Sequence, residues 1–221
     1  MFKNIKGAIF DMDGTLVDSL MLWNIIWAKF GSLFCEDGVF APSEKDDKAI
    51  RTMTLKDAMD YIHSHYNIGK TGSELFDKAN EIINDFYSNE VMLKDGVAEF
   101  LEYCKAKGIK MCIASASDME FLKIAAKRCD IEKYFVDIIS CVDVGKGKEE
   151  PDIYLKAMEI LGTTADETCI FEDSHVAICT ADKLGIRTVG IYDKYNYGQE
   201  EIKKTATMYI AQGDTLKSLI V

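Results

Sequence analysis

Two aspartates near the start of the chain have the spacing of a site for a cation or for acid–base chemistry. Asp11 and Asp13 follow a short apolar run at residues 6–10, and Gly14 comes directly after them. Two carboxylates this close together at the end of a strand repel each other unless a cation lies between them. Gly14 allows the backbone to turn sharply after the pair. An Asx-type turn with two solvated acids would have the same sequence, so this segment alone leaves both interpretations open.

Small and basic residues follow two further apolar runs. Ser115 and Ala116 come after residues 109–114, where small side chains let backbone N–H groups approach an anion at the start of a helix. Lys148 comes after residues 136–141, and a lysine there can neutralise a phosphate or support a carboxylate nucleophile. The glycines around it do not form a P-loop, because the GxxxxGK[ST] pattern is absent. Each segment by itself is also explained by a capping loop or a solvated basic loop.

A second pair of acids, Glu172 and Asp173, follows the apolar run at residues 168–171. Oxygen ligands that come from separate strand ends, with water completing the coordination, suit Mg²⁺. Each of the four segments is a weak signal. Because all four would lie at the same edge of one sheet, a metal and phosphate site is a better explanation than coincidence.

The elements that must position these groups alternate between strand and helix after Gly96. Apolar runs of strand length are separated by amphipathic segments, which indicates a doubly wound parallel sheet. In such sheets, ligands bind beyond the carboxyl ends of the strands. The expected helices are 97–107, 118–129, 151–162 and 174–184, and further strands are expected at 187–191 and 208–211.

Residues 18–93 contain no convincing strand pattern. Apolar residues recur at helical spacing in 22–33, 54–66 and 75–86, and Thr71 with Glu74 has the spacing of a capping box. We therefore expect an α/β protein with a Rossmann-like parallel-sheet core, residues 1–17 and 94–221, and an inserted all-helical cap domain, residues 18–93.

Composition excludes several classes of protein. The chain has 221 residues, a net charge of −11 and a hydrophobic content of 48%. The negative charge argues against a general nucleic-acid binder, and the hydrophobic content argues against a disordered chain. No uncharged stretch reaches the ~20 residues that a membrane-spanning helix needs. The seven cysteines include no CxxC pair, so we expect a reduced, cytoplasmic protein in which Cys112, Cys141 and Cys169 are buried.

Four segments together resemble the signature motifs of the haloacid dehalogenase superfamily. They are DxDGTLVDS at 11–19, Ser115, GKxxPDIYLKA at 147–157 and EDS at 172–174. The resemblance covers essentially the whole chain, and the most similar subfamily is that of the beta-phosphoglucomutase-like phosphatases. It implies a Rossmann-like core with a helical cap, an aspartyl-phosphate intermediate and an essential Mg²⁺.

The resemblance also implies roles for the acidic residues. Asp11 would be the nucleophile and a metal ligand. Asp13 would be the general acid and base, with its backbone carbonyl on the metal. Asp173 would complete the protein ligands, and Glu172 would lie just outside the metal's coordination sphere or join it. A carboxylate that attacks a phosphate dianion meets charge repulsion, which Mg²⁺ and Lys148 can offset.

The substrate-binding residues implied by the resemblance are Ser115, Ala116 and Lys148, which would hold the transferring phosphoryl group. Trp23, near the start of the helical insert, is the candidate for lining the substrate cleft. Sugar-phosphate mutases of this group usually have a histidine at the position of Trp23 and a phosphate-binding arginine at that of Leu55. Arg51 is close by but out of register, so the mutase interpretation is weakened.

We therefore expect a Mg²⁺-dependent phosphatase that acts on a small phosphorylated metabolite, as a cytoplasmic monomer with no nucleic-acid or membrane partner. Asp13 favours phosphoryl transfer from an oxygen ester, since dehalogenases usually lack this residue. Two alternatives stay open: a beta-phosphoglucomutase-like sugar-phosphate mutase, and a non-catalytic module that binds a phosphometabolite. No motif in the insert identifies the substrate.

Overall fold

The computed structural model describes residues 4–51 and 53–220, and the chain forms two compact units. One unit combines Met1–Leu20 with Val91–Val221, and the other is Met21–Glu90. These boundaries lie slightly deeper in the insert than the expected 17/18 and 93/94. The physical reason is that both connecting segments are held by the first unit: Val17 forms an antiparallel bridge with Leu93, and the N–H of Asp18 donates to the carbonyl of Met92 at 3.0 Å.

The first unit contains a six-stranded sheet in which all neighbouring strands are parallel. The strands are β1 (Gly7–Phe10), β2 (Lys110–Ser115), β3 (Phe135–Ser140), β4 (Thr168–Glu172), β5 (Arg187–Ile191) and β6 (Met208–Ile210). Their order in the sheet is β3-β2-β1-β4-β5-β6. The chain thus builds one side of β1 first and then returns to build the other. The carboxyl ends of β1 and β4 therefore meet at the switch point, where ligands bind in folds of this kind.

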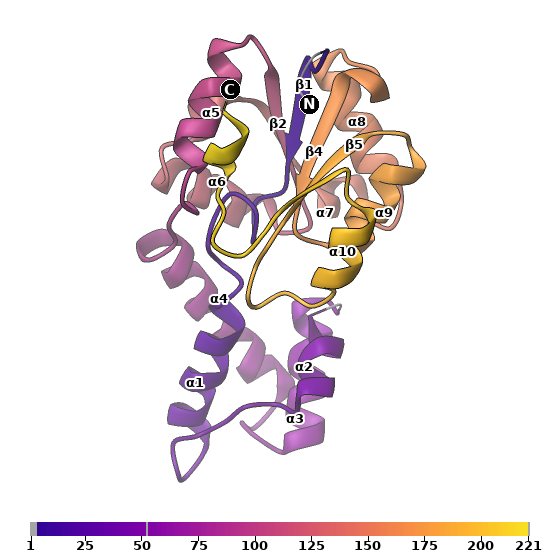
Figure 1. The fold of residues 1–221 in the computed structure, drawn as a ribbon. Coiled ribbons are helices and arrows are strands. Elements are labelled where there is room, and N and C mark those ends of the chain that lie inside the picture. The colour runs from indigo at the N-terminus through magenta and orange to yellow at the C-terminus, as the bar shows by residue number, and fades with distance from the viewer. Residues whose placement is uncertain (1–3, 52, 221) are drawn as a thin grey trace. The chain divides into compact units, whose positions relative to one another are not determined.

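Helices lie on both sides of this sheet (Figure 1). They are α5 (Val97–Ala106), α6 (Met119–Arg128), α7 (Cys141–Val144), α8 (Asp152–Leu161), α9 (His175–Lys183) and α10 (Gln199–Thr205). Short 3-10 turns occur at Glu132–Tyr134, Ala165–Glu167 and Leu216–Leu219. Helix α8 packs across β1, β2 and β3, and α9 packs on β4 and β5. The expected fold class, a parallel-sheet α/β core of Rossmann type, is confirmed.

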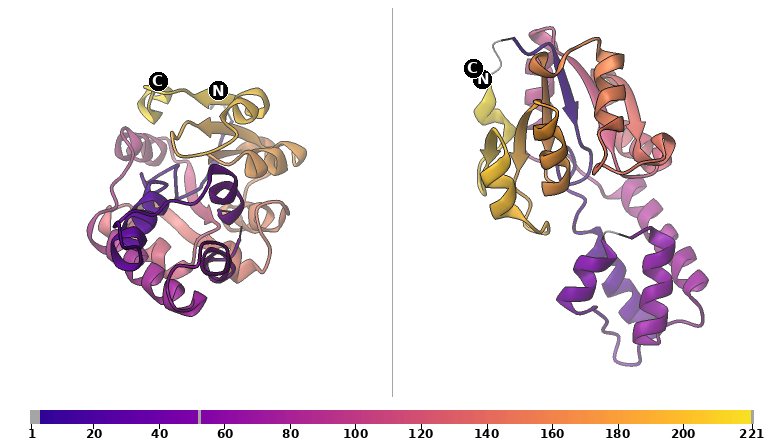
Figure 2. Two further views of the ribbon diagram at one scale, coloured as in Figure 1. Left: turned by 90° about the horizontal axis from the view of Figure 1, so that it is seen from below. Right: turned by 90° about the vertical axis from the view of Figure 1, so that its right-hand side faces the viewer.

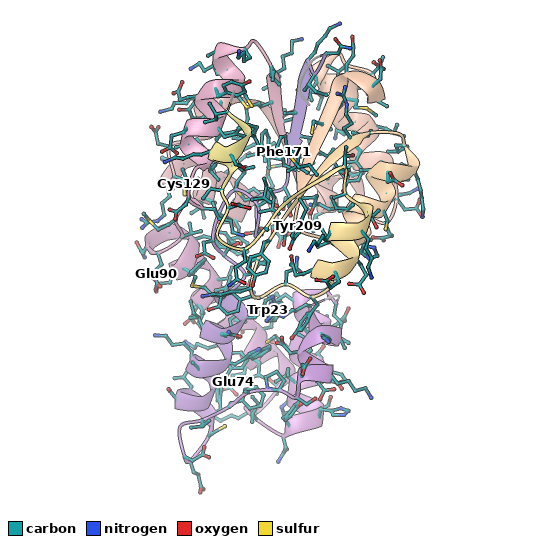
Figure 3. The ribbon with its side chains drawn as sticks, viewed as in Figure 1. Trp23, Glu74, Glu90, Cys129, Phe171 and Tyr209 are labelled. Atoms are coloured by element: carbon teal, nitrogen blue, oxygen red, sulfur yellow. The ribbon has the colours of Figure 1, made fainter. Side chains whose placement is uncertain are left out.

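Successive strand residues face opposite sides of the sheet, so both faces must be apolar. Ile9 and Ile170 pack with Tyr154 of α8 in one cluster. The residues that follow them, Phe10 and Phe171, stack on each other with ring centroids 4.4 Å apart. Figure 3 labels Phe171 within the strands. This packing fixes the direction of each strand, and with it the place where the next polar residue leaves the sheet.

The second unit is helical, and none of the described residues between 21 and 90 forms a strand (Figure 2). Its helices are α1 (Leu22–Phe34), α2 (Glu44–Ile50), α3 (Leu55–Tyr66) and α4 (Gly72–Asn89). Helix α4 packs on both α1 and α3. The hydroxyls of Thr54 and Thr71 cap α3 and α4 by accepting from the N–H groups of Asp57 and Glu74.

Three sequence-based details are corrected by the structure. The short helices α2 and α10 were not predicted, because EKDDKAI and QEEIKKT contain too few apolar residues to show a helical period. The predicted capping box at Thr71 is half formed: Thr71 accepts from the N–H of Glu74, but Glu74 Oε2 accepts from the N–H of Lys70 at 2.6 Å. The carboxylate therefore satisfies a neighbouring donor instead of the N–H of Thr71 itself.

Cys112, Cys141 and Cys169 are buried free thiols, as expected. In the described part of the chain, no helix is both long enough and apolar enough to span a membrane.

Candidate active site at the carboxyl ends of the strands

The loop after β1 brings Asp11 to the switch point of the sheet. The N–H of Asp11 donates to the carbonyl of Phe171 at 3.0 Å, which continues the β1–β4 pairing by one residue. Gly14 then has a φ of +76°, and a Cβ atom there would lie 2.4 Å from Asp173 Oδ2. Only glycine accepts both this conformation and this contact. The turn thus places the acids that follow β1 directly beside those that follow β4.

Lys148 lies between the acids of the two strands. Its Nζ is 2.8 Å from Asp11 Oδ1 and also pairs with Glu172 Oε1. Burial opposes the charge on Lys148, but Asp11 and Glu172 outweigh this effect and raise the pKa of the ammonium well above its usual value. The two carboxylates therefore favour the charged form of Lys148.

Asp11, Glu172 and Asp173 form a buried acidic cluster in which one carboxylate oxygen from each residue lies within 4.8 Å of the other two. Burial, with the charge of Asp11, raises the pKa of Glu172 to about 7. Burial and the charges of Glu172 and Asp11 hold the pKa of Asp173 well above its usual range. One lysine between three carboxylates leaves an excess of negative charge, which a cation would relieve.

The donor set fits a hard divalent cation. Asp11 Oδ1 accepts no well-directed hydrogen bond from the described residues, although Lys148 is close to it. A carboxylate oxygen can accept more than one partner, and coordination of a cation would give this buried oxygen a second one. All three side chains offer carboxylate oxygens, the ligands that Mg²⁺ prefers. The cluster can therefore hold a metal ion.

The side chain of Asp13 is outside this cluster and is held by two serines. Ser19 Oγ donates to Asp13 Oδ1, and Ser117 Oγ donates to Asp13 Oδ2, both at 2.6 Å. Ser19 comes from the chain after β1 and Ser117 from the loop after β2. Both carboxylate oxygens are thus oriented by hydroxyl donors. The family resemblance implies that Asp13 contacts a metal through its backbone carbonyl, and this role stays a prediction.

The loop after β2 contains the predicted phosphate-binding residues. Ser115 is the last residue of β2 and is buried, whereas Ala116 is exposed. The N–H of Ser117 faces Ser115 Oγ at 3.4 Å, and the carbonyl of Ser117 accepts from the buried Ser140 Oγ at 2.7 Å. Ser140, the last residue of β3, thus holds this loop in place.

Trp23 belongs to the helical unit. Its ring lies 5.5 Å from that of Trp27 and 6.0 Å from the guanidinium of Arg51. Asp47, which is buried, accepts from Trp27 Nε1 at 2.9 Å and from Arg51 Nε at 2.8 Å. Figure 3 labels Trp23 on α1. Its contribution to a substrate cleft stays a prediction.

Sequence reasoning missed several polar residues that contact the site. Ser19 lies within the quoted DxDGTLVDS motif and Ser117 directly follows the small residues after β2, so spacing could have indicated both. Asn196 had no such signal. Its amide nitrogen donates to Asp173 Oδ2 at 2.6 Å from a loop with no periodicity.

Comparison with known proteins identifies the family of the chain. Residues 8–191 match the model of the haloacid dehalogenase-like hydrolase family, and the chain belongs to that family. The chain is 27% identical to a phosphorylated carbohydrates phosphatase of Thermotoga maritima, over 97% of this chain and 98% of the relative. It is 32% identical to a putative pyrophosphatase, PpaX, of Caldanaerobacter subterraneus, over 85% of this chain and 81% of the relative.

Solved structures show the same fold. The crystal structure of a putative beta-phosphoglucomutase from Thermotoga maritima matches with a TM-score of 0.81 at 24% identity, over 97% of this chain and 98% of that one. The expectation of a hydrolase of this family is confirmed.

Proposed function

We propose that the protein is a Mg²⁺-dependent phosphatase that hydrolyses a small phosphorylated metabolite through an aspartyl-phosphate on Asp11. The observation that carries the proposal is the position of Asp11 at the switch point, where it pairs with Lys148 and lies in one cluster with Glu172 and Asp173. Curated relatives include phosphatases named for phosphorylated carbohydrates and for phosphoglycolate. We therefore propose a phosphorylated sugar or small phosphorylated acid as the substrate.

In the first step, a carboxylate oxygen of Asp11 attacks phosphorus, and the ester oxygen leaves with the bonding electron pair. Asp13 gives the leaving oxygen a proton, so that an alcohol and not an alkoxide departs. The hydroxyls of Ser19 and Ser117 hold Asp13 for this transfer. Lys148 pairs with the developing charge on the transferred group, and Ser115 with the backbone N–H of Ala116 supplies hydrogen bonds to its oxygens.

In the second step, water attacks the phosphorus of the aspartyl-phosphate. Asp13, now ionised, accepts the proton of that water, inorganic phosphate leaves and the carboxylate of Asp11 is restored. Covalent capture divides one difficult displacement into two easier ones. Asp11, Asp173 and the backbone carbonyl of Asp13 would hold Mg²⁺, with Glu172 beside it, and the bound metal supplies positive charge against the repulsion between carboxylate and phosphate.

The helical unit favours hydrolysis over mutase chemistry. A mutase must hold a second phosphate while its bisphosphorylated intermediate reacts. Leu55, the first residue of α3, has an apolar side chain that cannot pair with a phosphate dianion. Arg51, the neighbouring cation, already pairs with Asp47 at 2.8 Å. We therefore expect water, and not a second substrate hydroxyl, to receive the phosphoryl group.

The test is inorganic phosphate release from a panel of phosphorylated sugars and small acids with Mg²⁺. Asp11→Asn should lower turnover to background, because an amide is a poor nucleophile and a weaker ligand. Asp214→Asn, the same substitution at an exposed position, is the matched control and should keep full activity. Rapid acid quenching should show one phosphoryl group on the Asp11 peptide of the wild type. Full turnover by Asp11→Asn, or in excess EDTA, would contradict the mechanism.

A further inference from the structure

Asn196 holds the carboxylate and the backbone of Asp173 at the same time. Its Nδ2 donates to Asp173 Oδ2 at 2.6 Å and to the main-chain carbonyl of Asp173 at 2.5 Å. The other carboxylate oxygen, Oδ1, accepts from Thr15 Oγ1 at 3.2 Å. An amide nitrogen has two N–H donors, so Asn196 can make both bonds together. The rotamer of Asp173 is thus fixed from a loop that is distant in sequence.

That loop, residues 192–198 after β5, is itself anchored by Lys94. Lys94 Nζ lies 2.7 Å from Asp193 Oδ2 and donates to the carbonyl of Tyr192 at 3.2 Å. The ion pair is well shielded, since only 17% of the Lys94 side chain and 4% of the Asp193 side chain are exposed. Shielding makes the pair less sensitive to salt than a surface pair.

The loop is also braced from the last strand. Tyr209 of β6, labelled in Figure 3, donates its hydroxyl to Gln199 Oε1 at 2.8 Å. Gln199 Nε2 in turn donates to the carbonyl of Asp193 at 3.2 Å. The backbone N–H of Asn196 donates to the same carbonyl, also at 3.2 Å. Asn196 is therefore presented by a loop held at several points.

Lys94 also reaches the loop after β1. Its Nζ donates to the carbonyl of Gly14 at 2.6 Å. Gly14 directly follows Asp13 and lies against Asp173, with no room for a Cβ atom between them. One ammonium group thus ties the loop after β1 to the loop after β5, and Asp173 contacts both loops.

We propose that Asn196 and Lys94 are positioning residues for Asp173, which set the direction of its carboxylate toward the metal of the candidate active site. The inference rests on the proposed function, because it assigns Asp173 as a metal ligand. Neither residue touches the reacting atoms in this assignment. Carboxylates that bind metals are themselves held by hydrogen bonds, and loss of such a partner typically lowers metal affinity by about 10–100-fold.

The test measures metal affinity directly, without substrate. Mn²⁺, which accepts the same oxygen ligands as Mg²⁺, is titrated into the full chain and the free ion is followed by electron paramagnetic resonance. Asn196→Ala should raise the Kd for Mn²⁺ by about 10–100-fold. Lys94→Met should raise it in the same direction, and Lys94→Arg should restore part of the affinity because it returns a cation to the same place. Thermal unfolding is measured for every variant.

Two matched controls separate this role from general loss of stability. Asn89→Ala removes an exposed hydrogen bond from Asn89 Nδ2 to Asp85 Oδ1 of 2.7 Å, and Lys217→Met removes an exposed ion pair with Glu99. Both should leave the Kd unchanged. A purely structural loop predicts instead that Tm falls while the Kd of the folded variants stays at the wild-type value.

The outcomes are distinct. Wild-type Kd values in Asn196→Ala and Lys94→Met would overturn the inference, and so would a wild-type chain that binds no Mn²⁺. If Asn196→Ala does not fold, the contrast between Lys94→Met and Lys94→Arg decides. If the variants lose affinity as expected but the wild type releases no phosphate from any ester, the positioning role stands and the proposed function fails.

Discussion

Replacement of Lys148 by methionine tests how much this lysine contributes to stability by neutralising the buried acids of the core unit. Lys148 lies 2.8 Å from Asp11 and pairs with Glu172, and both the lysine and its partners are almost fully buried. Methionine keeps most of the volume of the lysine stem but removes the charge. The three carboxylates of the cluster then have no cation between them. Breaking a buried ion pair by removing one partner costs about 3–5 kcal/mol, because an uncompensated charge stays buried.

Part of this cost should depend on pH. Removal of Lys148 takes away a charge that lowers the pKa of Glu172, whose pKa burial already raises to about 7. The folded variant then binds more protons than the unfolded chain near neutral pH, so its stability falls as pH rises. If the folded state binds one proton more than the unfolded chain, the free energy of unfolding falls by about 1.4 kcal/mol for each unit that the pH rises. We expect the destabilisation to be roughly 1–2 kcal/mol smaller at pH 6 than at pH 8.

The assay is urea unfolding followed by circular dichroism, in EDTA, at pH 6 and pH 8. Lys217→Met is the matched control, since it breaks an exposed pair with Glu99 and should leave the free energy of unfolding almost unchanged. A double variant, Lys148→Met with Glu172→Gln, should recover part of the loss because it removes one unpaired carboxylate. If Lys148→Met unfolds within about 1 kcal/mol of Lys217→Met at pH 8, the reasoning from buried charge is wrong.

Two further predictions concern other parts of the chain. Hydrogen bonds from Tyr66, Ser43 and Tyr61 lower the pKa of Asp46 to about 2. The contribution of these hydrogen bonds to the stability of the folded protein is therefore fully present above about pH 4 and is lost as the pH falls toward 2. A carboxyl-carbon NMR titration should show this pKa and its rise toward the usual value in Tyr66→Phe; an unchanged midpoint would contradict the assignment. A thiol reagent at pH 8 should modify the partly exposed Cys35 and Cys179 in the native protein, while four buried thiols should react only after unfolding. Burial raises the pKa of these four to about 11 for Cys141 and about 12 for Cys104, Cys112 and Cys169, and rapid native labelling of any of them would refute their burial.

The sheet and the acidic cluster were predictable because their signals are local. The two strands that meet at the switch point, β1 and β4, are apolar runs that lead directly into acidic residues, and parallel strands bring their carboxyl ends to one edge of the sheet. From that rule alone, Asp11 and Asp173 had to lie near each other, although 162 residues separate them along the chain. The side chain of Lys148 followed from the same rule, since its loop comes after β3.

The supporting residues were not predictable, because no local pattern marks them. Lys94 lies in the core unit just after the insert, and its partner Asp193 is about 100 residues away along the chain, so no local pattern marks the contact. Asn196 lies in a loop whose composition suggests only a turn. Helix α2 shows the same limit: its polar sequence is stabilised by the Ser43 cap, and its buried Asp47 bonds to Trp27 of α1.

In the proposed mechanism, metal binding and the stability of this core are coupled. Burial raises the pKa values of Glu172 and Asp173. The ionised forms of these two side chains therefore lower the stability of the folded state when no cation is present. Lys148 offsets one charge of the cluster, and Lys94 lowers the pKa of Asp173 in the same sense. A metal that binds only the folded state adds about 2.7 kcal/mol at one hundred times its Kd. The acids of the proposed mechanism therefore lower the stability of the metal-free protein, and the Mg²⁺ of that mechanism would also restore this stability.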